Sequence, residues 1–201
     1  SSEAVRQFVS DCPTCQKYRT PNSNTKNKEV LHAIPIRTTH GLVTADTFKM
    51  PKDDYNNTHI LVIINHLTKM IDLKALNSKD SSNIVKALYE HMCDNGVPEQ
   101  ILTDPGSEFN NNDMESLAQW LGLVHTFSIA KRPQGHGTER SIGKTKMHLG
   151  ILLGSENITE RWSDRSVLPA IKLIMNNTIN LETNAIPFHL RYGTLAATAY
   201  D

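Results

Sequence analysis

The run HILVIIN at residues 59–65 constrains the fold more than any other segment of this chain. Its apolar stretch is built mainly from β-branched residues, which favour a strand. The apolar residues are consecutive and do not alternate with polar ones, so the strand is expected to be buried on both faces. A strand of this kind belongs inside a sheet that helices cover. We therefore expect an α/β domain organised around this run.

The segments on either side of this run predict two further strands. Residues 41–50, GLVTADTFKM, are typical of a strand, and PKDDYNN at 51–57 is rich in the residues that form turns. LTKMIDLKAL at 67–76 is a third strand, reached from the second by a tight turn. Three strands in succession indicate an antiparallel meander.

Helices and strands alternate after the meander. A helix capped by Asp80 or Ser81 should end at Gly96, with an apolar stripe at Ile84, Ala87, Leu88 and His91 or Met92. Strands follow at 99–104 and 123–129, helices at 111–122, 138–153, 163–181 and 186–192. Strands separated by helices pair in parallel through right-handed crossovers. The order βββαβαβ predicts an α/β fold, a five-stranded mixed sheet flanked by helices.

The N-terminal part differs in character from this domain. Residues 1–19 combine a helix end with the pair Cys12 and Cys15, and the polar stretch TPNSNTKNKE that follows is typical of a linker. We expect a small unit at 1–19, a linker at 20–38 and the main domain at 39–201. Three cysteines make no disulfide framework, so the close pair is either metal-linked or reduced. The third, Cys93, is expected in the core.

Three acids occupy positions where a sheet meets a loop or a helix. Asp46 lies in the first strand, Asp104 ends the fourth, and Glu139 opens the helix after the fifth. Chemistry in open sheets gathers where strand ends and loops converge. Carboxylates gathered there would suit Mg²⁺, and two such ions can support an in-line phosphodiester displacement.

Each acid also has a simpler interpretation. Asp46 could face solvent, Asp104 could close a bend before Pro105-Gly106, and Glu139 could complement a helix dipole. The joint arrangement in one fold order favours the metal site.

The charge balance limits the class of partner. Lys and Arg number 21 and Asp and Glu 21, which argues against a strongly basic nucleic-acid binder but permits a local basic patch. Five cations surround Glu139: Lys131, Arg132, Arg140, Lys144 and Lys146. They form either such a DNA-binding patch or a solvated face, and His136 is either a further DNA contact or polar surface. Lys146 lies two helical turns after Glu139 and on the same face, whereas Lys144 is expected to point to solvent. Apolar runs are too short to span a bilayer.

The motifs together resemble the integrases of LTR retroelements, in particular the gypsy type. ILTDPGSEF at 101–109 is similar to the family's second-aspartate motif, VTADTF at 43–48 to its first, and RPQGHGTER at 132–140 to its glutamate motif. VRQFVSDCPTCQKYR at 5–19 is similar to half of the family's His-His-Cys-Cys zinc domain. The resemblance continues from Trp162 to Gly193 and so covers nearly the whole chain.

The resemblance implies an RNase H-like fold with a catalytic triad at Asp46, Asp104 and Glu139. It implies a DDE-type polynucleotidyl transferase and endonuclease that uses two Mg²⁺ or Mn²⁺ ions. Such an enzyme trims the 3′ ends of element DNA and joins them to target DNA. Zn²⁺ at Cys12 and Cys15 is expected only if a His pair precedes them. The implied partners are double-stranded DNA and further copies of the chain, in the nucleus or in a retroelement particle.

The chain departs from the family pattern at several places. Glu139 follows Pro133 by six positions, one fewer than is usual, and Asn65 and Ile142 replace the family's usual Asp and Asn. These departures leave a second interpretation open, a domesticated or decayed integrase that binds DNA or protein without catalysis. An RNase H-type nuclease acting on hybrid duplexes is a third.

Overall fold

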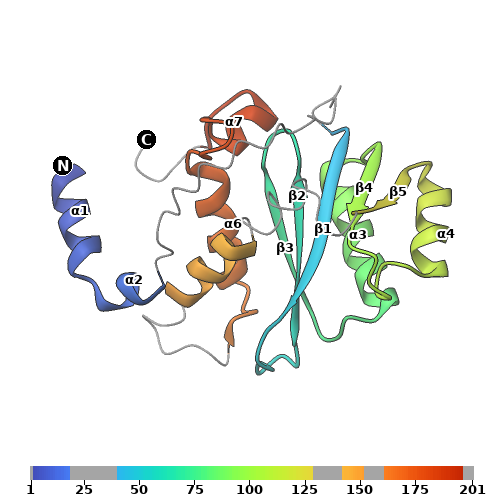
Figure 1. Cartoon of the computed structure of the whole chain (residues 1–201), viewed down its shortest axis with the longest axis horizontal. Coiled ribbons are helices and arrows are strands. Elements are labelled where there is room, and N and C mark those ends of the chain that lie inside the picture. Colours follow the sequence, from blue (N-terminus) through green and yellow to red (C-terminus); the bar gives the residue numbers. More distant parts are fainter. Residues whose placement is uncertain (1, 19–39, 129–141, 152–160, 197–201) are drawn as a thin grey trace.

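The computed structural model describes residues 2–18, 40–128, 142–151 and 161–196 (Figure 1). A five-stranded sheet forms the centre, with β1 at Leu42–Lys49, β2 at His59–Asn65, β3 at Ile71–Leu76, β4 at Gln100–Thr103 and β5 at Val124–Phe127. The spatial order is β3-β2-β1-β4-β5. The first three strands pair antiparallel, and β1, β4 and β5 pair in parallel. The predicted mixed sheet is therefore confirmed.

The run HILVIIN forms β2 and is buried on both faces, as expected. Leu61 and Ile63 join a core with α3 (Ser81–Asn95) and α4 (Asn112–Leu121) on one face of the sheet. Ile60 and Val62 join a second core on the other face, with the helix at 142–151 and α6 (Val167–Asn177). Figure 1 shows α3 and α4 on one side of the sheet and α6 on the other.

The third strand begins at Ile71, four residues later than predicted. Asn65 explains the difference, because its side-chain oxygen accepts hydrogen bonds from the backbone N–H of Leu67 at 3.1 Å and of Thr68 at 2.9 Å. Lys69 continues the turn with φ 61°. Asn65 therefore shapes the β2–β3 turn with its amide oxygen, an acceptor that an aspartate would also offer.

The predicted signals at the ends of α3 and α4 are largely confirmed. Asn111 caps α4 by accepting a hydrogen bond from Met114 N at 3.0 Å, and Gly122 ends the helix in the left-handed region. Asp80 precedes α3 without a side-chain cap, and Gly96 follows it with φ 89°. The apolar stripe of α3 is buried as predicted, whereas the expectation for Cys93 is wrong. Cys93 is exposed, because it lies just outside the stripe that ends at His91 and Met92.

The C-terminal helices are α6 and α7 (Pro187–Tyr192). The first is shorter than the predicted 163–181, since Asp164 organises a turn before it by accepting from Ser166 N at 2.9 Å. Trp162 is fully buried and its Nε1 donates to Pro51 O at 2.7 Å. This contact ties the β1–β2 turn to the segment that leads into α6.

The N-terminal residues form α1 (Ser2–Asp11) and α2 (Pro13–Tyr18). Cys12 lies between the two helices and is half-buried. In the described parts of the chain, no helix combines the length and apolar character needed to cross a membrane.

Candidate active site

Asp46 and Asp104 are brought together by the pairing of β1 with β4. The parallel register joins Leu42 to Gln100 and Thr44 to Leu102. The same register carried two residues further brings Asp104, the first residue after β4, level with Asp46. Adjacent strands lie about 4.8 Å apart. The two carboxylates therefore lie next to each other at the carboxyl-terminal end of β4, in the interior of the sheet. We call this end of the strands the Asp46 and Asp104 edge.

The Asp46 carboxyl is half-buried, with Oδ1 accepting a hydrogen bond from Thr47 N at 2.6 Å. Burial raises its pKa to about 6, against the lowering effect of that hydrogen bond. The nearby charges of Asp104 and Glu108 raise the pKa further, and Lys146 lowers it. Asp46 is therefore a carboxylate that lacks enough positive charge around it.

Asp104 is exposed, and its Oδ1 accepts from Gly106 N at 3.3 Å. The bend that the Asp-Pro-Gly sequence suggested is therefore present. It does not compete with a functional role, because the carboxylate remains open to solvent. Gly106 makes the bend possible: a Cβ there would lie 3.1 Å from Asp104 Oδ1 and 2.5 Å from Glu108 Oε2.

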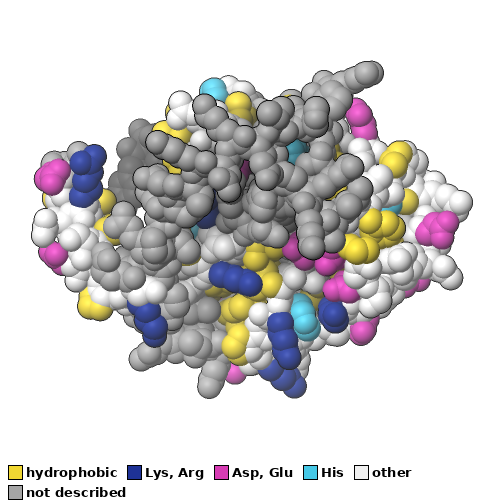
Figure 2. Space-filling view, viewed as in Figure 1, with side chains coloured by type: hydrophobic (Ala, Val, Ile, Leu, Met, Phe, Trp, Pro, Cys, Tyr) yellow, Lys and Arg dark blue, Asp and Glu magenta, His cyan; other side chains and the backbone are white. Residues whose placement is uncertain are grey.

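Glu108 is a third acid at this edge, and sequence reasoning missed it. Its side chain is only 13% exposed, and Lys79 Nζ lies 3.5 Å from its Oε1. On the face shown in Figure 2, acidic side chains border a group of basic side chains and a histidine. The motif ILTDPGSEF contained Glu108, but its approach to Asp104 depends on the fold of the turn between them. The sequence feature that could have pointed to Glu108 is its position two residues after Gly106, the glycine of the bend.

Lys146 approaches the same edge from the helix at 142–151. Its Nζ lies over the Phe48 ring, 5.0 Å from the centroid, and its charge acts on Asp46. Ile142 and Leu149 of this helix are buried, as the predicted stripe requires. Lys144, expected to point to solvent, is half-buried.

The other predicted site residues lie outside the described ranges. These are Glu139 and the predicted DNA-binding residues Lys131, Arg132, His136 and Arg140. The Cys15 side chain is also outside them, so the Cys12 and Cys15 pair stays a prediction. Among the described side chains, no three of His, Cys, Asp and Glu come close enough to form a metal cluster.

The residue types at this edge suit a hard divalent cation, although the described side chains alone form no cluster of three. Asp46, Asp104 and Glu108 offer carboxylate oxygens, the ligand type that Mg²⁺ and Mn²⁺ prefer. Burial is the main reason for the raised pKa of Asp46, and repulsion from Asp104 and Glu108 adds to it, so added positive charge would favour the ionised carboxylate. Glu139, the third predicted ligand, lies outside the described residues, so the metal site stays a prediction.

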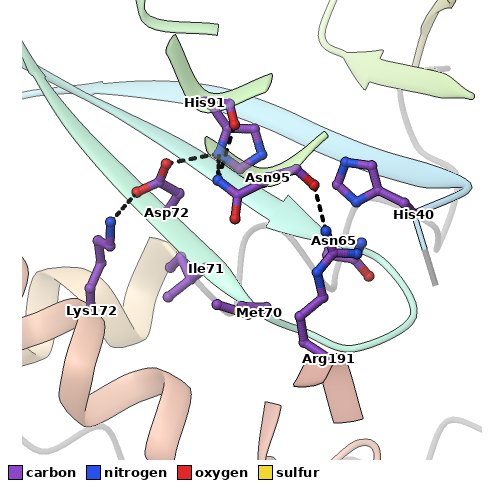
Figure 3. A pocket seen from close by; sticks show the side chains of 9 residues that line it. All are labelled: His40, Asn65, Met70, Ile71, Asp72, His91, Asn95, Lys172 and Arg191. Carbon is purple, nitrogen blue, oxygen red and sulfur yellow. Dashed lines mark hydrogen bonds and ion pairs between the residues drawn. The ribbon is translucent and has the colours of Figure 1, made fainter. Parts of the chain in front are cut away.

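A second polar site lies at the opposite end of the strands (Figure 3). It is a cavity of about 50 Å³ lined by residues that include His40, which precedes β1, and Asn65, which ends β2. Asp72 lies there between Lys172 Nζ at 2.6 Å and His91 Nδ1 at 2.8 Å. Burial opposes its ionisation, but the hydrogen bonds from His91 and Lys172 outweigh burial and hold the pKa of Asp72 well below its usual range.

The charged side chains of this second site are paired with groups of the protein itself. Arg191 donates to the carbonyl oxygen of Asn95 at 2.5 Å, and a His40 ring nitrogen lies 2.5 Å from that of Gly96. These carbonyls stand at the end of α3, where cations are favourable. The cluster therefore joins β3, α3, α6 and α7, and it differs from the Asp46 and Asp104 edge, where negative charge is in excess.

Comparison with known proteins identifies what this chain is similar to. No protein-family model matches it. It is 27% identical to the Pro-Pol polyprotein of Simian foamy virus type 1 over 143 residues, which is 71% of this chain and 12% of the relative. It is 24% identical to the retrovirus-related Pol polyprotein from transposon 412 of Drosophila melanogaster over 153 residues, with 75% and 12% covered. The chain thus spans about an eighth of these relatives.

Solved structures agree with this finding. One match is a chain of the simian T-cell lymphotropic virus intasome in complex with PP2A regulatory subunit B56 gamma. The match covers 96% of this chain and 67% of that chain, with a TM-score of 0.68 and 17% sequence identity. The match to the catalytic core domain of BIV integrase covers 78% of this chain and 95% of that domain, with a TM-score of 0.63 and 17% sequence identity. The match to the HTLV-2 integrase catalytic core domain in complex with magnesium covers 76% of this chain and 97% of that domain, with a TM-score of 0.63 and 12% sequence identity.

These findings place the chain among known folds and relatives. Its homologues are retroviral and retrotransposon Pol polyproteins. Its RNase H-like fold, a five-stranded mixed sheet with flanking helices, is that of retroviral integrase catalytic cores.

Proposed function

We propose that this chain is the catalytic core of a retroelement integrase, which processes the 3′ ends of element DNA and transfers them into target DNA. The observation that carries the proposal is the parallel register of β1 and β4, which, continued by two residues, sets Asp46 of β1 level with Asp104, the first residue after β4. A half-buried carboxyl whose pKa is raised to about 6 is an unfavourable arrangement unless a cation occupies the edge. A DNA-binding or protein-interaction module without catalysis would gain nothing from a half-buried carboxyl of this kind.

The proposed site consists of Asp46, Asp104 and Glu139, which would hold two Mg²⁺ or Mn²⁺ ions. Bound there, the ions would neutralise phosphate charge and favour ionisation of the attacking hydroxyl. Asp46 contributes oxygens that Thr47 N and partial burial keep in one orientation. Asp104 contributes an exposed carboxylate on the Gly106 bend. Lys146, next to Asp46, would contact a phosphate of the bound strand.

Two phosphoryl transfers follow from this arrangement. In the first, water attacks a phosphodiester near the 3′ end; a new P–O bond forms and the bond to the 3′ oxygen breaks, leaving a 3′ hydroxyl. In the second, that hydroxyl attacks a phosphodiester of target DNA. The 3′ oxygen of the target strand leaves and takes up a proton. The same carboxylates would serve both steps.

Further parts of the proposal come from the resemblance and the comparisons. Residues 1–19 would form half of a zinc-binding domain, and 20–38 a linker to the core at 39–201. Cys12 and Cys15 would be zinc ligands only if a His pair precedes them. Lys131, Arg132, His136 and Arg140 would contact DNA together with Lys146. We expect a homo-oligomer, since one neighbour is an intasome and the HTLV-2 core occurs in trimeric and dimeric forms. The expected location is the nucleus or a retroelement particle.

A strand-transfer assay tests the proposal. The full chain is incubated with Mn²⁺, a labelled duplex with recessed 3′ ends and a supercoiled plasmid. We expect labelled plasmid products that disappear in Asp46→Asn and Asp104→Asn. Asp94→Asn is the matched control, because Asp94 is an exposed acid of α3 that pairs with Lys74 at 3.6 Å. Products that survive Asp104→Asn, or a wild-type chain that forms none, would overturn the proposal.

A further inference from the structure

Glu108 lies at the candidate active site but takes no part in the proposed triad. The turn that carries it is strongly braced. Phe109 is fully buried and its N–H donates to Gly106 O at 2.9 Å. Asn111 Nδ2 donates to the carbonyl oxygens of Ser107 at 3.0 Å and Glu108 at 2.9 Å. The backbone that carries Glu108 is therefore held in one place next to the Gly106 bend.

The Glu108 carboxylate is aimed at the space beside Asp104. Both carboxylates approach the open side of Gly106, where a Cβ would lie 2.5 Å from Glu108 Oε2 and 3.1 Å from Asp104 Oδ1. Nothing in the turn separates the two acids. Glu108 therefore adds negative charge to the position where Asp104 would hold a cation.

Lys79 restrains Glu108 from the other side. It lies in the connection between β3 and α3, with Nζ 3.5 Å from Glu108 Oε1. The Lys79 side chain is 56% exposed, whereas that of Glu108 is 13% exposed. A surface ion pair of this kind contributes little to stability. Its consequence is local: it draws one Glu108 oxygen away from Asp104 and offsets part of the charge of Glu108.

We propose that Glu108 and Lys79 form a positioning pair that sets the affinity of the active site for divalent cations. Glu108 raises the affinity by adding negative charge beside Asp104, and Lys79 lowers it by pairing with Glu108. The inference rests on the proposed function, because it concerns the cation that Asp104 would hold. It assigns roles to two residues outside the Asp46, Asp104 and Glu139 set.

Calorimetric titration of the full chain with MnCl₂ in the absence of DNA tests this inference. Glu108→Gln should weaken Mn²⁺ binding about 3- to 10-fold, as expected for one charge a few Å from a divalent ion in a partly screened site. Lys79→Gln should change the affinity in the opposite direction and strengthen it about 2- to 5-fold, because it frees Glu108. Glu108→Asp should restore part of the affinity.

Two further variants complete the experiment. Glu115→Gln removes an exposed acid from the first turn of α4 and should leave Mn²⁺ affinity unchanged. Asp104→Asn should abolish binding at this site. Thermal melts without metal should show every variant folded, since none of these side chains belongs to either hydrophobic core.

The outcomes separate the inference from the proposed function. If Asp104→Asn abolishes Mn²⁺ binding while Glu108→Gln and Lys79→Gln match wild type, the positioning pair is wrong and the proposed function stands. The inference also fails if both variants shift affinity in the same direction, since a merely structural role would do that. If the wild-type chain binds no Mn²⁺, both ideas fall.

Discussion

Asp46 shows at the scale of one residue how a candidate active site can oppose stability. Its pKa is raised from 3.8 to about 6 by burial and by the neighbouring acids. The folded chain therefore holds this proton more strongly than the unfolded chain. The stability contribution of the protonated form is fully present below pH 3.8 and is lost as pH rises through about 6. At neutral pH and without metal, the ionised carboxylate destabilises the fold.

The first prediction is that Asp46→Asn stabilises the metal-free protein at pH 7. The amide removes the charge, and after allowance for solvent screening the gain should be about 1 to 2 kcal/mol. Urea denaturation in EDTA measures it. The gain should shrink as the pH falls from 7 to 4, because the wild-type carboxyl then becomes neutral too. A variant that is less stable than wild type at pH 7 would contradict this account of Asp46.

Asn111 stabilises both α4 and the turn that precedes it. Its side-chain oxygen caps the helix, and its amide nitrogen holds the carbonyls of Ser107 and Glu108. Asn111→Ala should therefore lower the free energy of unfolding by about 1 to 2 kcal/mol. Urea denaturation of the metal-free chain measures this loss.

Asn111→Asp separates the two roles of the side chain. It keeps the cap acceptor and loses the amide donors, so it should retain most of the helix stability. It should still loosen the turn and weaken Mn²⁺ binding. Equal stability of Asn111→Ala and wild type would show that the cap contributes nothing.

Asp72 provides the main polar connection between elements in the second site. The carboxylate joins β3 to α3 through His91 and to α6 through Lys172. Its folded pKa lies below the unfolded value, so its contribution is present above about pH 4 and is lost as pH falls through the folded pKa. Asp72→Asn should cost about 2 to 4 kcal/mol at pH 7, since it removes the carboxylate that the buried His91 and the half-buried Lys172 share.

The pH dependence of this loss checks its origin. Urea denaturation of wild type and Asp72→Asn at pH 7 and at pH 3 should give a smaller difference at the lower pH. Lys172→Gln should show the same trend to a smaller extent, because its side chain is 38% exposed. A difference that grows on acidification would mean that Asp72 is held by something other than these ion pairs.

At the scale of the whole molecule, the elements and the mixed sheet could be predicted, whereas the register between strands and the contacts of the turns could not. β2 and the ends of α4 were predictable because apolar runs, Asn caps and terminal glycines act within a few residues. The level placement of Asp46 and Asp104 depends on the register between β1 and β4, which are separated by two strands and a helix. The approach of Glu108 to Asp104 depends on a turn anchored by the buried Phe109.

Two errors of prediction are local. Cys93 was expected in the core because it lies near the apolar face of α3, but the buried stripe ends at His91 and Met92 and Cys93 is exposed. The segment at 163–166 was expected to be helical, but Asp164 offers its backbone a competing set of hydrogen bonds. The predictions for Glu139 and for most of the basic patch lie outside the described residues and stay predictions.

The proposed function requires that Asp46 and Asp104 together hold the cation for phosphoryl transfer. Crystals of the full chain soaked in MnCl₂ and measured at a wavelength where manganese scatters anomalously would test this requirement. We expect an anomalous peak within about 2.3 Å of carboxylate oxygens of both Asp46 and Asp104, the range for a hard divalent ion. We also expect the peak to disappear in Asp104→Asn. Ordered, unliganded carboxylates at saturating Mn²⁺, or a peak elsewhere on the surface, would contradict the proposed function.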